Sequence, residues 1–222
     1  MKNAFNKHLC LGLGAALLAL APALGQASVV VGDTNMIVNG SFENVPFGLS
    51  GSDGSYCYVG SSNFGCAAPL PDWDGRFALV ASGSGAWSAT PATGADRFHV
   101  GLQNDSFFTQ EIVVGSPGQY TLTWSDAGRS GYADETYQVS FGGVLLATQT
   151  TVGGQGWATH SVSFSSAFGY HTLAFTGLTV GGDATAFIDN LSMAAAVPEP
   201  ASWALLAGGL FGVATVARRR RA

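Results

Sequence analysis

The sequence predicts an all-β domain, a two-sheet jelly-roll sandwich of about ten short strands, flanked by two segments that lie outside the fold. Glycine accounts for 31 of the 222 residues and charged residues for only 10%, against roughly 7% and 25% in an average soluble chain. Apolar and polar side chains alternate in short windows that end at glycine or proline, which is typical of half-buried strands joined by tight turns. No window has the period of an amphipathic helix.

The alternating windows define the expected strands. Trp124 is in phase with other apolar residues of its window, so we assign it to the core. Gly142-Gly143 predicts a hairpin between its neighbouring windows. The windows around Val162 and Phe175 are expected to pair across the turn 165–168 as a second hairpin. The expected strands are residues 36–42, 76–80, 97–102, 108–114, 120–125, 137–141, 144–148, 162–164, 173–175 and 184–193.

The N-terminal segment 1–27 has the pattern of a secretory signal peptide. Lys2 and Lys7 precede a short apolar run, and small residues lead to a cleavage site after Ala27. We therefore expect export, loss of Cys10 with the signal, and a single domain over residues 28–196.

The C-terminal segment 197–222 has three parts. Pro198, Glu199 and Pro200 come first, and the mostly apolar run 201–217 is long enough for a short membrane span. Four arginines, Arg218, Arg219, Arg220 and Arg221, follow and favour the cytoplasmic side. This arrangement resembles the PEP-CTERM sorting signal, which implies an exosortase as processing partner in a Gram-negative bacterium that makes exopolysaccharide. The resemblance implies a transient inner-membrane anchor followed by release to the cell surface or matrix. The alternative is a tail anchor without processing.

The charges of residues 28–196 exclude some partners and several kinds of enzyme. Three arginines and thirteen acidic residues give a net charge of −10, which opposes binding to nucleic acid and favours cations or uncharged sugars. The absence of lysine after Lys7 excludes Schiff-base and Walker-type chemistry. A hydrolase with two carboxylates stays open, although Asp72 with Asp74 and Asp134 with Glu135 are too close in sequence to face each other. We expect no enzyme.

Cys57 and Cys66 are the two cysteines of the exported part, nine residues apart in a Ser/Gly-rich stretch. In an oxidising compartment the simplest expectation is a disulfide that rigidifies the loop 46–71. A metal pair or free thiols are the alternatives.

Four motifs in the same order resemble galactose-binding-like domains and related carbohydrate-binding modules. They are Asn39-Gly40-Ser41-Phe42-Glu43, Pro71-Asp72-Trp73, Gln110-Glu111-Ile112 with Pro117-Gly118-Gln119-Tyr120, and Ile188-Asp189-Asn190-Leu191. The resemblance covers nearly the whole exported part. It implies a jelly roll with a structural calcium held by Glu43 and Asp189, because the first and last strands of a jelly roll can lie side by side. Capping or turn roles without an ion are the alternative.

Aromatic side chains in loop-like sequence are the candidates for stacking on sugar rings. They are Trp73, Trp87, Tyr56, Tyr58 and, in the opposite phase to its strand's core residues, Trp157. His160 and His171 are expected to lie on the inward phase of the second hairpin, and His99 is expected to be exposed.

Together these features favour a non-catalytic surface or matrix protein of biofilms that binds polysaccharide. The alternatives are a structural or adhesive matrix protein without a sugar site and, less favoured, a secreted glycoside hydrolase. Exposed loop aromatics would favour sugar binding, and the same rings packed inside would favour the structural role.

Overall fold

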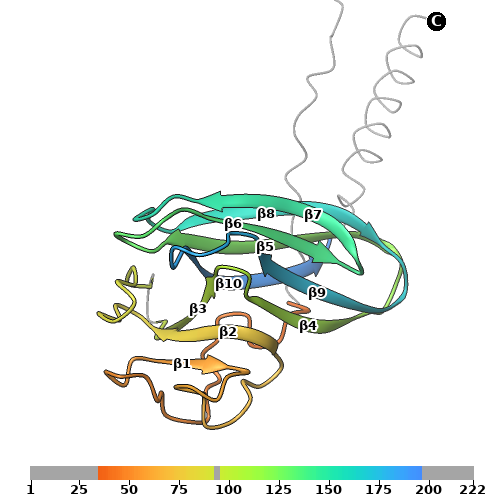
Figure 1. The fold of residues 1–222 in the computed structure, drawn as a ribbon. Coiled ribbons are helices and arrows are strands. Elements are labelled where there is room, and N and C mark those ends of the chain that lie inside the picture. Colours follow the sequence, from red (N-terminus) through yellow and green to blue (C-terminus); the bar gives the residue numbers. More distant parts are fainter. Residues whose placement is uncertain (1–34, 93–95, 197–222) are drawn as a thin grey trace, which may run out of the picture.

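The computed structural model describes residues 35–92 and 96–196, which form ten antiparallel strands (Figure 1). The strands are β1 (Tyr56–Val59), β2 (Asp74–Ala81), β3 (Phe98–Gln103), β4 (Phe107–Val114), β5 (Gly118–Gly128), β6 (Glu135–Phe141), β7 (Val144–Thr151), β8 (Ala158–Ser166), β9 (Gly169–Gly177) and β10 (Thr185–Ala195). The expected all-β class is confirmed. These residues include no helix able to cross a membrane, and the predicted signal peptide 1–27 and tail 197–222 lie outside the described residues.

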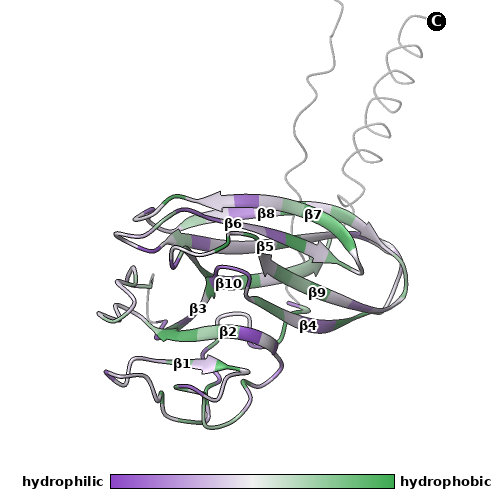
Figure 2. Cartoon of the chain, viewed as in Figure 1, coloured by the Kyte–Doolittle hydropathy of each residue, from purple (hydrophilic) through white to green (hydrophobic). Residues whose placement is uncertain are grey.

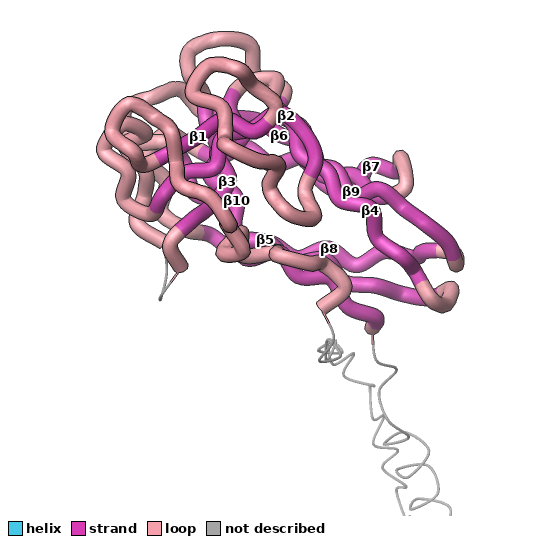
Figure 3. The backbone as a smooth tube through the Cα atoms, turned by 90° about the horizontal axis from the view of Figure 1, so that it is seen from below, coloured by secondary structure: helices cyan, strands magenta, loops and turns pink. Residues whose placement is uncertain are grey.

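The strands form one folded and nearly closed sheet with the order β7-β6-β9-β4-β2-β3-β10-β5-β8, and β1 pairs with β2. Strand β2 belongs to both layers: its start at Asp74–Arg76 pairs with β4, and its later part pairs with β3. The sheet therefore turns over at β2, and its two halves face each other across the core (Figures 1 and 3).

Two expectations about the strands are wrong. The segment 36–42 consists of turns, because Asn39 and Phe42 adopt positive φ angles of 52° and 57° that a strand does not allow. The second expected hairpin does not form: β8 pairs with β5, whereas β9 pairs with β4 and β6. The turn after β8 therefore carries the chain from one layer to the other.

The main core between the layers is rich in aromatic rings. Phe108 and Phe175 stack at 4.8 Å across the paired strands β4 and β9, and Trp124 is 1% exposed, as expected. A buried polar chain crosses this core: Trp124 Nε1 donates to Tyr137 Oη at 2.8 Å, and Tyr137 donates to Asp126 Oδ2 at 2.7 Å. The chain joins β5 of one layer to β6 of the other, so it fixes how the layers sit on each other.

A second, smaller core covers the outer face of the strands β1, β2, β3 and β10. The loop between β2 and β3 folds over this face and inserts Trp87 against Tyr56 and Phe187. His99 is fully buried beside Phe187, with ring centroids 4.8 Å apart, which contradicts the expected exposure. Burial lowers the pKa of His99 to about 4, so the ring is neutral. The side chains that point outward from β3 are therefore buried as well, under the second core.

Candidate functional site

Three of the five expected sugar-stacking rings lie inside the protein. Trp73 and Trp87 are each 2% exposed and Tyr56 is 8% exposed. Trp73 packs in the main core against Phe42 and donates its indole N–H to the carbonyl of Asn39 at 2.9 Å. Trp87 and Tyr56 belong to the second core. The expected exposure of these rings is not found, because both faces of this part of the sheet are covered.

The other two rings, Tyr58 and Trp157, are half-buried. Trp157 covers the edge of the second core, where it packs on His99 and donates its indole N–H to the carbonyl of Pro91 at 2.8 Å. Tyr58 lies at the other side of this core, 5.9 Å from Trp87 between ring centroids, and lines an open cleft. Of the five candidates, Tyr58 therefore has an accessible polar cleft beside it.

The floor of this cleft is the outer face of three paired strands. Tyr58 of β1 lies opposite Ala78 of β2, which lies opposite Gly101 of β3. Cross-strand partners point to the same face, and the space over the small residues Ala78 and Gly101 is filled by Trp87, whose ring lies 3.1 Å from the place of a Cβ at position 101. Beside this packing, Tyr58 lines a cleft of about 330 Å³, a size that suits a sugar unit. We call it the Tyr58 cleft.

Polar side chains form the rim of the Tyr58 cleft: Ser61, Asn63, Arg76, Gln103, Asn104, Asp105 and Ser106. Arg76 and Asp105 form an exposed ion pair at 3.0 Å. Asn104 Oδ1 and Ser106 Oγ are buried but have no hydrogen-bond partner within the described part of the chain. Buried polar atoms normally have partners, and both residues line the cleft.

The Cys57–Cys66 disulfide supports the position of Tyr58, and its prediction is confirmed by an S–S distance of 2.04 Å. The bridged loop folds back on β1: the Tyr58 N–H donates to the carbonyl of Phe64 at 2.9 Å, and its carbonyl accepts from Cys66 N–H at 3.0 Å. A closed loop of this length contributes about 3 kcal/mol in the chain-entropy model. The ring of Tyr58 is therefore held in place before any ligand arrives.

Glu43 and Asp189, the expected calcium ligands, lie close enough to repel each other. Asp189 is 1% exposed, and its Oδ2 has no hydrogen-bond partner among the described residues. Burial, with the carboxylates of Asp96 and Glu43, raises the pKa of Asp189 to about 8. Glu43 already accepts the backbone N–H groups of Arg97 at 2.6 Å and Phe98 at 2.8 Å.

The resemblance also requires the two ends of the described chain to meet, and they do. Met36 N–H donates to the carbonyl of Met193 at 2.7 Å, and Leu191 N–H donates to the carbonyl of Gly40 at 2.9 Å. Within residues 35–92 and 96–196, however, no group of three or more His, Cys, Asp or Glu side chains is arranged to hold a metal ion. The acids next to β10 therefore supply an unpaired oxygen but an incomplete ligand shell.

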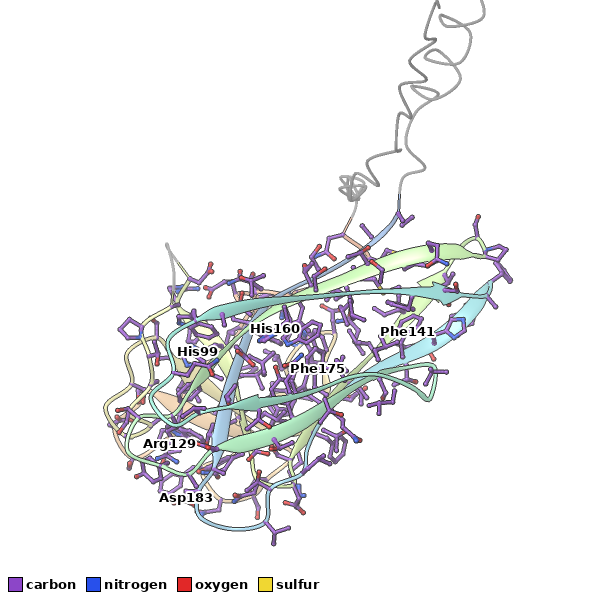
Figure 4. The ribbon with its side chains drawn as sticks, turned by 90° about the horizontal axis from the view of Figure 1, so that it is seen from above. His99, Arg129, Phe141, His160, Phe175 and Asp183 are labelled. Atoms are coloured by element: carbon purple, nitrogen blue, oxygen red, sulfur yellow. A yellow bond between two sulfur atoms is a disulfide. The ribbon has the colours of Figure 1, made fainter. Side chains whose placement is uncertain are left out.

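The remaining titratable candidates have structural contacts. Glu135 is buried, and its carboxylate accepts backbone N–H groups from Asn104, Leu178 and Thr179, while burial raises its pKa. His160 stacks on Trp124 at 5.3 Å, and its Nε2 lies 2.9 Å from Asp126 Oδ1 (Figure 4).

His171 lies in the opposite layer from His160, on β9, where it stacks on Phe141. The two histidines therefore do not share a hairpin.

Comparison with protein families identifies the chain. The model of a family described as "Protein of unknown function (DUF642)" matches residues 35–193. The chain belongs to this DUF642 family. The PEP-CTERM protein-sorting motif matches residues 196–221, which confirms the resemblance seen in the tail and implies export and sorting by an exosortase.

The solved structures with a similar fold are all-β and distant in sequence. The EclA C-terminal domain, a sugar-binding protein, is 18% identical with a TM-score of 0.35, and the match covers 38% of this chain and 64% of that one. TmCBM61 in complex with β-1,4-galactotriose is 18% identical with a TM-score of 0.44, over 73% of this chain and 99% of that one. The module CBM36 in complex with calcium and xylotriose is 13% identical with a TM-score of 0.36, over 43% and 79%. No curated protein matches the sequence.

Proposed function

We propose that this DUF642 protein is an exported, non-catalytic jelly-roll module that binds polysaccharide in the Tyr58 cleft. The observation that carries the proposal is the combination of one fixed aromatic ring with buried, unpaired polar atoms. A sugar ring stacks on the tyrosine face, while Asn104 Oδ1 and Ser106 Oγ accept or share its hydroxyl hydrogens.

The charge of the domain favours an uncharged polysaccharide. The exported part has a net charge of −10, and the arginine at the cleft, Arg76, is already paired with Asp105 at 3.0 Å. An anionic polymer would meet repulsion from the domain and little free positive charge at the rim. The host's exopolysaccharide is the expected partner where it is neutral.

A glycan array that includes the host's exopolysaccharide tests the proposal with residues 28–196. Tyr58→Ala should abolish binding, and Tyr170→Ala is the matched control because Tyr170 is 72% exposed and lies away from the cleft. Ser106→Ala should weaken binding without loss of stability, since it removes a hydroxyl that has no partner in the free protein. Binding that is unchanged in Tyr58→Ala would contradict the proposed site.

A structural or adhesive matrix protein is the second candidate, and the burial of Trp73, Trp87 and Tyr56 favours it. These rings stabilise the fold and leave Tyr58 as the stacking group of the cleft. A correctly folded sample that binds no glycan on the array would support this second function.

A structural calcium at Glu43 and Asp189 forms part of the proposal. Its support is the unpaired, buried Oδ2 of Asp189 with the carboxylate of Glu43 near it, because a hard cation prefers such oxygen ligands. Backbone carbonyls and water would have to complete the shell. The ion would hold the first described residues against β10, and its role would be structural.

A further inference from the structure

One end of the sandwich carries exposed apolar side chains in place of the acids found elsewhere. It is formed by the turns after β4, β6 and β8 and by the end of β10, and we call it the β10 end. Phe168 and Tyr170 are each 72% exposed, Val144 is 64% exposed and Val113 is 55% exposed. Exposed apolar groups that gather in this way mark an interaction surface.

Two of these side chains are brought together by strand register. Tyr170 of β9 lies directly opposite Val113 of β4 on the outer face of the sheet. Phe168 is in the turn that leads into β9, and Val144 begins β7 directly after the turn Gly142-Gly143. Figure 2 colours this part of β7 as hydrophobic, and Figure 4 shows Phe141 toward this end and Arg129 at the other.

The described turns and strand ends that form the β10 end contain no charged residue. No Asp, Glu, Lys or Arg occurs in residues 112–125, 136–182 or 190–198, which include all three turns and the last part of β10. Glu111 on β4 is the nearest acid along that strand. An anionic membrane surface repels the acidic remainder of this domain, but it meets no like charge on these uncharged segments.

The described chain leaves the domain at this same end. Ala196 N–H donates to the carbonyl of Gln119 at 2.8 Å, and Gln119 pairs with Ser165 of β8. Ala196 is thus level with the last residues of β8, and Phe168 lies in the turn beyond them. The sorting motif begins at residue 196, so the sorting tail starts beside the apolar side chains.

The short connection holds the β10 end close to the bilayer. Four residues separate Ala196 from the apolar run 201–217, and the connection reaches at most about 17 Å when fully extended. The headgroup layer on one side of a membrane is roughly 6 Å thick. A domain tethered in this way faces the headgroups with the end that carries Phe168 and Tyr170, and aromatic side chains are favoured at that depth.

We propose that the β10 end docks on the outer surface of the inner membrane while the sorting tail is still attached. Phe168 and Tyr170 insert at the headgroup level, and Val113 packs beside Tyr170. The Tyr58 cleft lies where β3 pairs with the first residues of β10. These residues are at the opposite end of β10 from Ala195, so the cleft faces away from the membrane. This proposal relies on the tail being inserted but not on glycan binding.

The test uses residues 28–222, in which Cys57 and Cys66 are bridged and no other cysteine remains, in vesicles of phosphatidylethanolamine and phosphatidylglycerol. An environment-sensitive fluorophore is attached in a Phe168→Cys variant. Val180→Cys is the matched control, since Val180 is 93% exposed in the loop before β10, at the opposite end. Both positions are exposed, so neither change disturbs a core.

Headgroup-level nitroxide lipids should remove most of the fluorescence at position 168 and leave position 180 unchanged, while aqueous iodide should do the reverse. Equal access of iodide to both positions would overturn the proposal. Protection of position 168 from iodide without quenching by the lipids would also overturn it, because a second protein copy would then cover the surface. A glycan array result has no bearing on these outcomes, so failure of the two proposals is distinguishable.

Discussion

Asp189 controls how the stability of the domain varies with pH. Its pKa is about 8 in the folded protein, against the ordinary value of 3.8, because of burial and the nearby Asp96 and Glu43. The folded state therefore holds this proton more tightly than the unfolded state, and the penalty is absent below about pH 4 and grows as the pH rises toward 8. At about 1.4 kcal/mol per pH unit, the free energy of unfolding should fall by about 4 kcal/mol between pH 5 and 8 from this residue alone.

Asp189→Asn removes this dependence without removing the local contact. The side-chain Oδ1 still accepts the N–H of Asn190, which it does at 2.7 Å in the wild type. Urea unfolding in the presence of a chelator should give equal stability below about pH 4, and the advantage of the variant should grow by about 4 kcal/mol between pH 5 and pH 8. His99, with its pKa lowered to about 4, makes stability fall as the pH drops below about 6.5, but it does so in both proteins. Parallel pH curves for the two proteins would refute the reasoning.

Calcium should make the wild type more stable than Asp189→Asn at pH 8. An ion beside Asp189 stabilises the ionised carboxylate, so calcium at pH 8 should raise the melting temperature of the wild type and a chelator should lower it. Glu43→Ala should abolish that response. If neither calcium nor a chelator changes the melting temperature of the wild type, the calcium site is contradicted. Glu43 then serves only to accept the backbone N–H groups of Arg97 and Phe98.

Three further results are expected. Tyr137→Phe should lower the free energy of unfolding by about 3–5 kcal/mol in urea denaturation, because it leaves a buried carboxylate oxygen and an indole N–H without partners; a loss near zero would mean that the polar chain does not join the layers. Thiol labelling of the exported protein without reductant should find Cys57 and Cys66 unreactive, and labelling of either would contradict the bridge. Deletion of residues 198–222 should release the protein from the membrane fraction, and retention there would contradict an anchoring tail.

Periodicity predicts most of the strands and fails where backbone conformation decides. Nine of the ten expected windows overlap a strand, because alternation reports a face packed on a core. The window 36–42 also alternates, yet Asn39 adopts a positive φ and the segment turns. Alternation does not predict the strand β1, because it lies within the Ser/Gly-rich disulfide loop and β2 is its one partner among the described strands.

Pairing between strands cannot be read from alternation. Windows that follow each other across a short turn usually form a hairpin, but β8 and β9 have partners in different layers. Either arrangement buries Val162 and Phe175 toward the core, so the local pattern is the same for both.

The candidate site shows the same limit. Tyr58 was found by residue type, and the bridge that holds it was found by cysteine spacing. The cleft lies where Tyr58, Ala78 and Gly101 are placed side by side, which is a property of the register of three strands. The burial of Trp87 depends on the second core, and a loop that covers a sheet leaves no periodic signal.

Mapping a bound oligosaccharide by NMR on residues 28–196 tests the central claim most directly. We predict that the backbone amide shifts caused by the ligand are largest at Tyr58, Gly101, Gln103 and Ser106, around the Tyr58 cleft. Shifts that gather instead around Trp157 or the β10 end, from a saturable ligand, would contradict the claim that this cleft is the binding site.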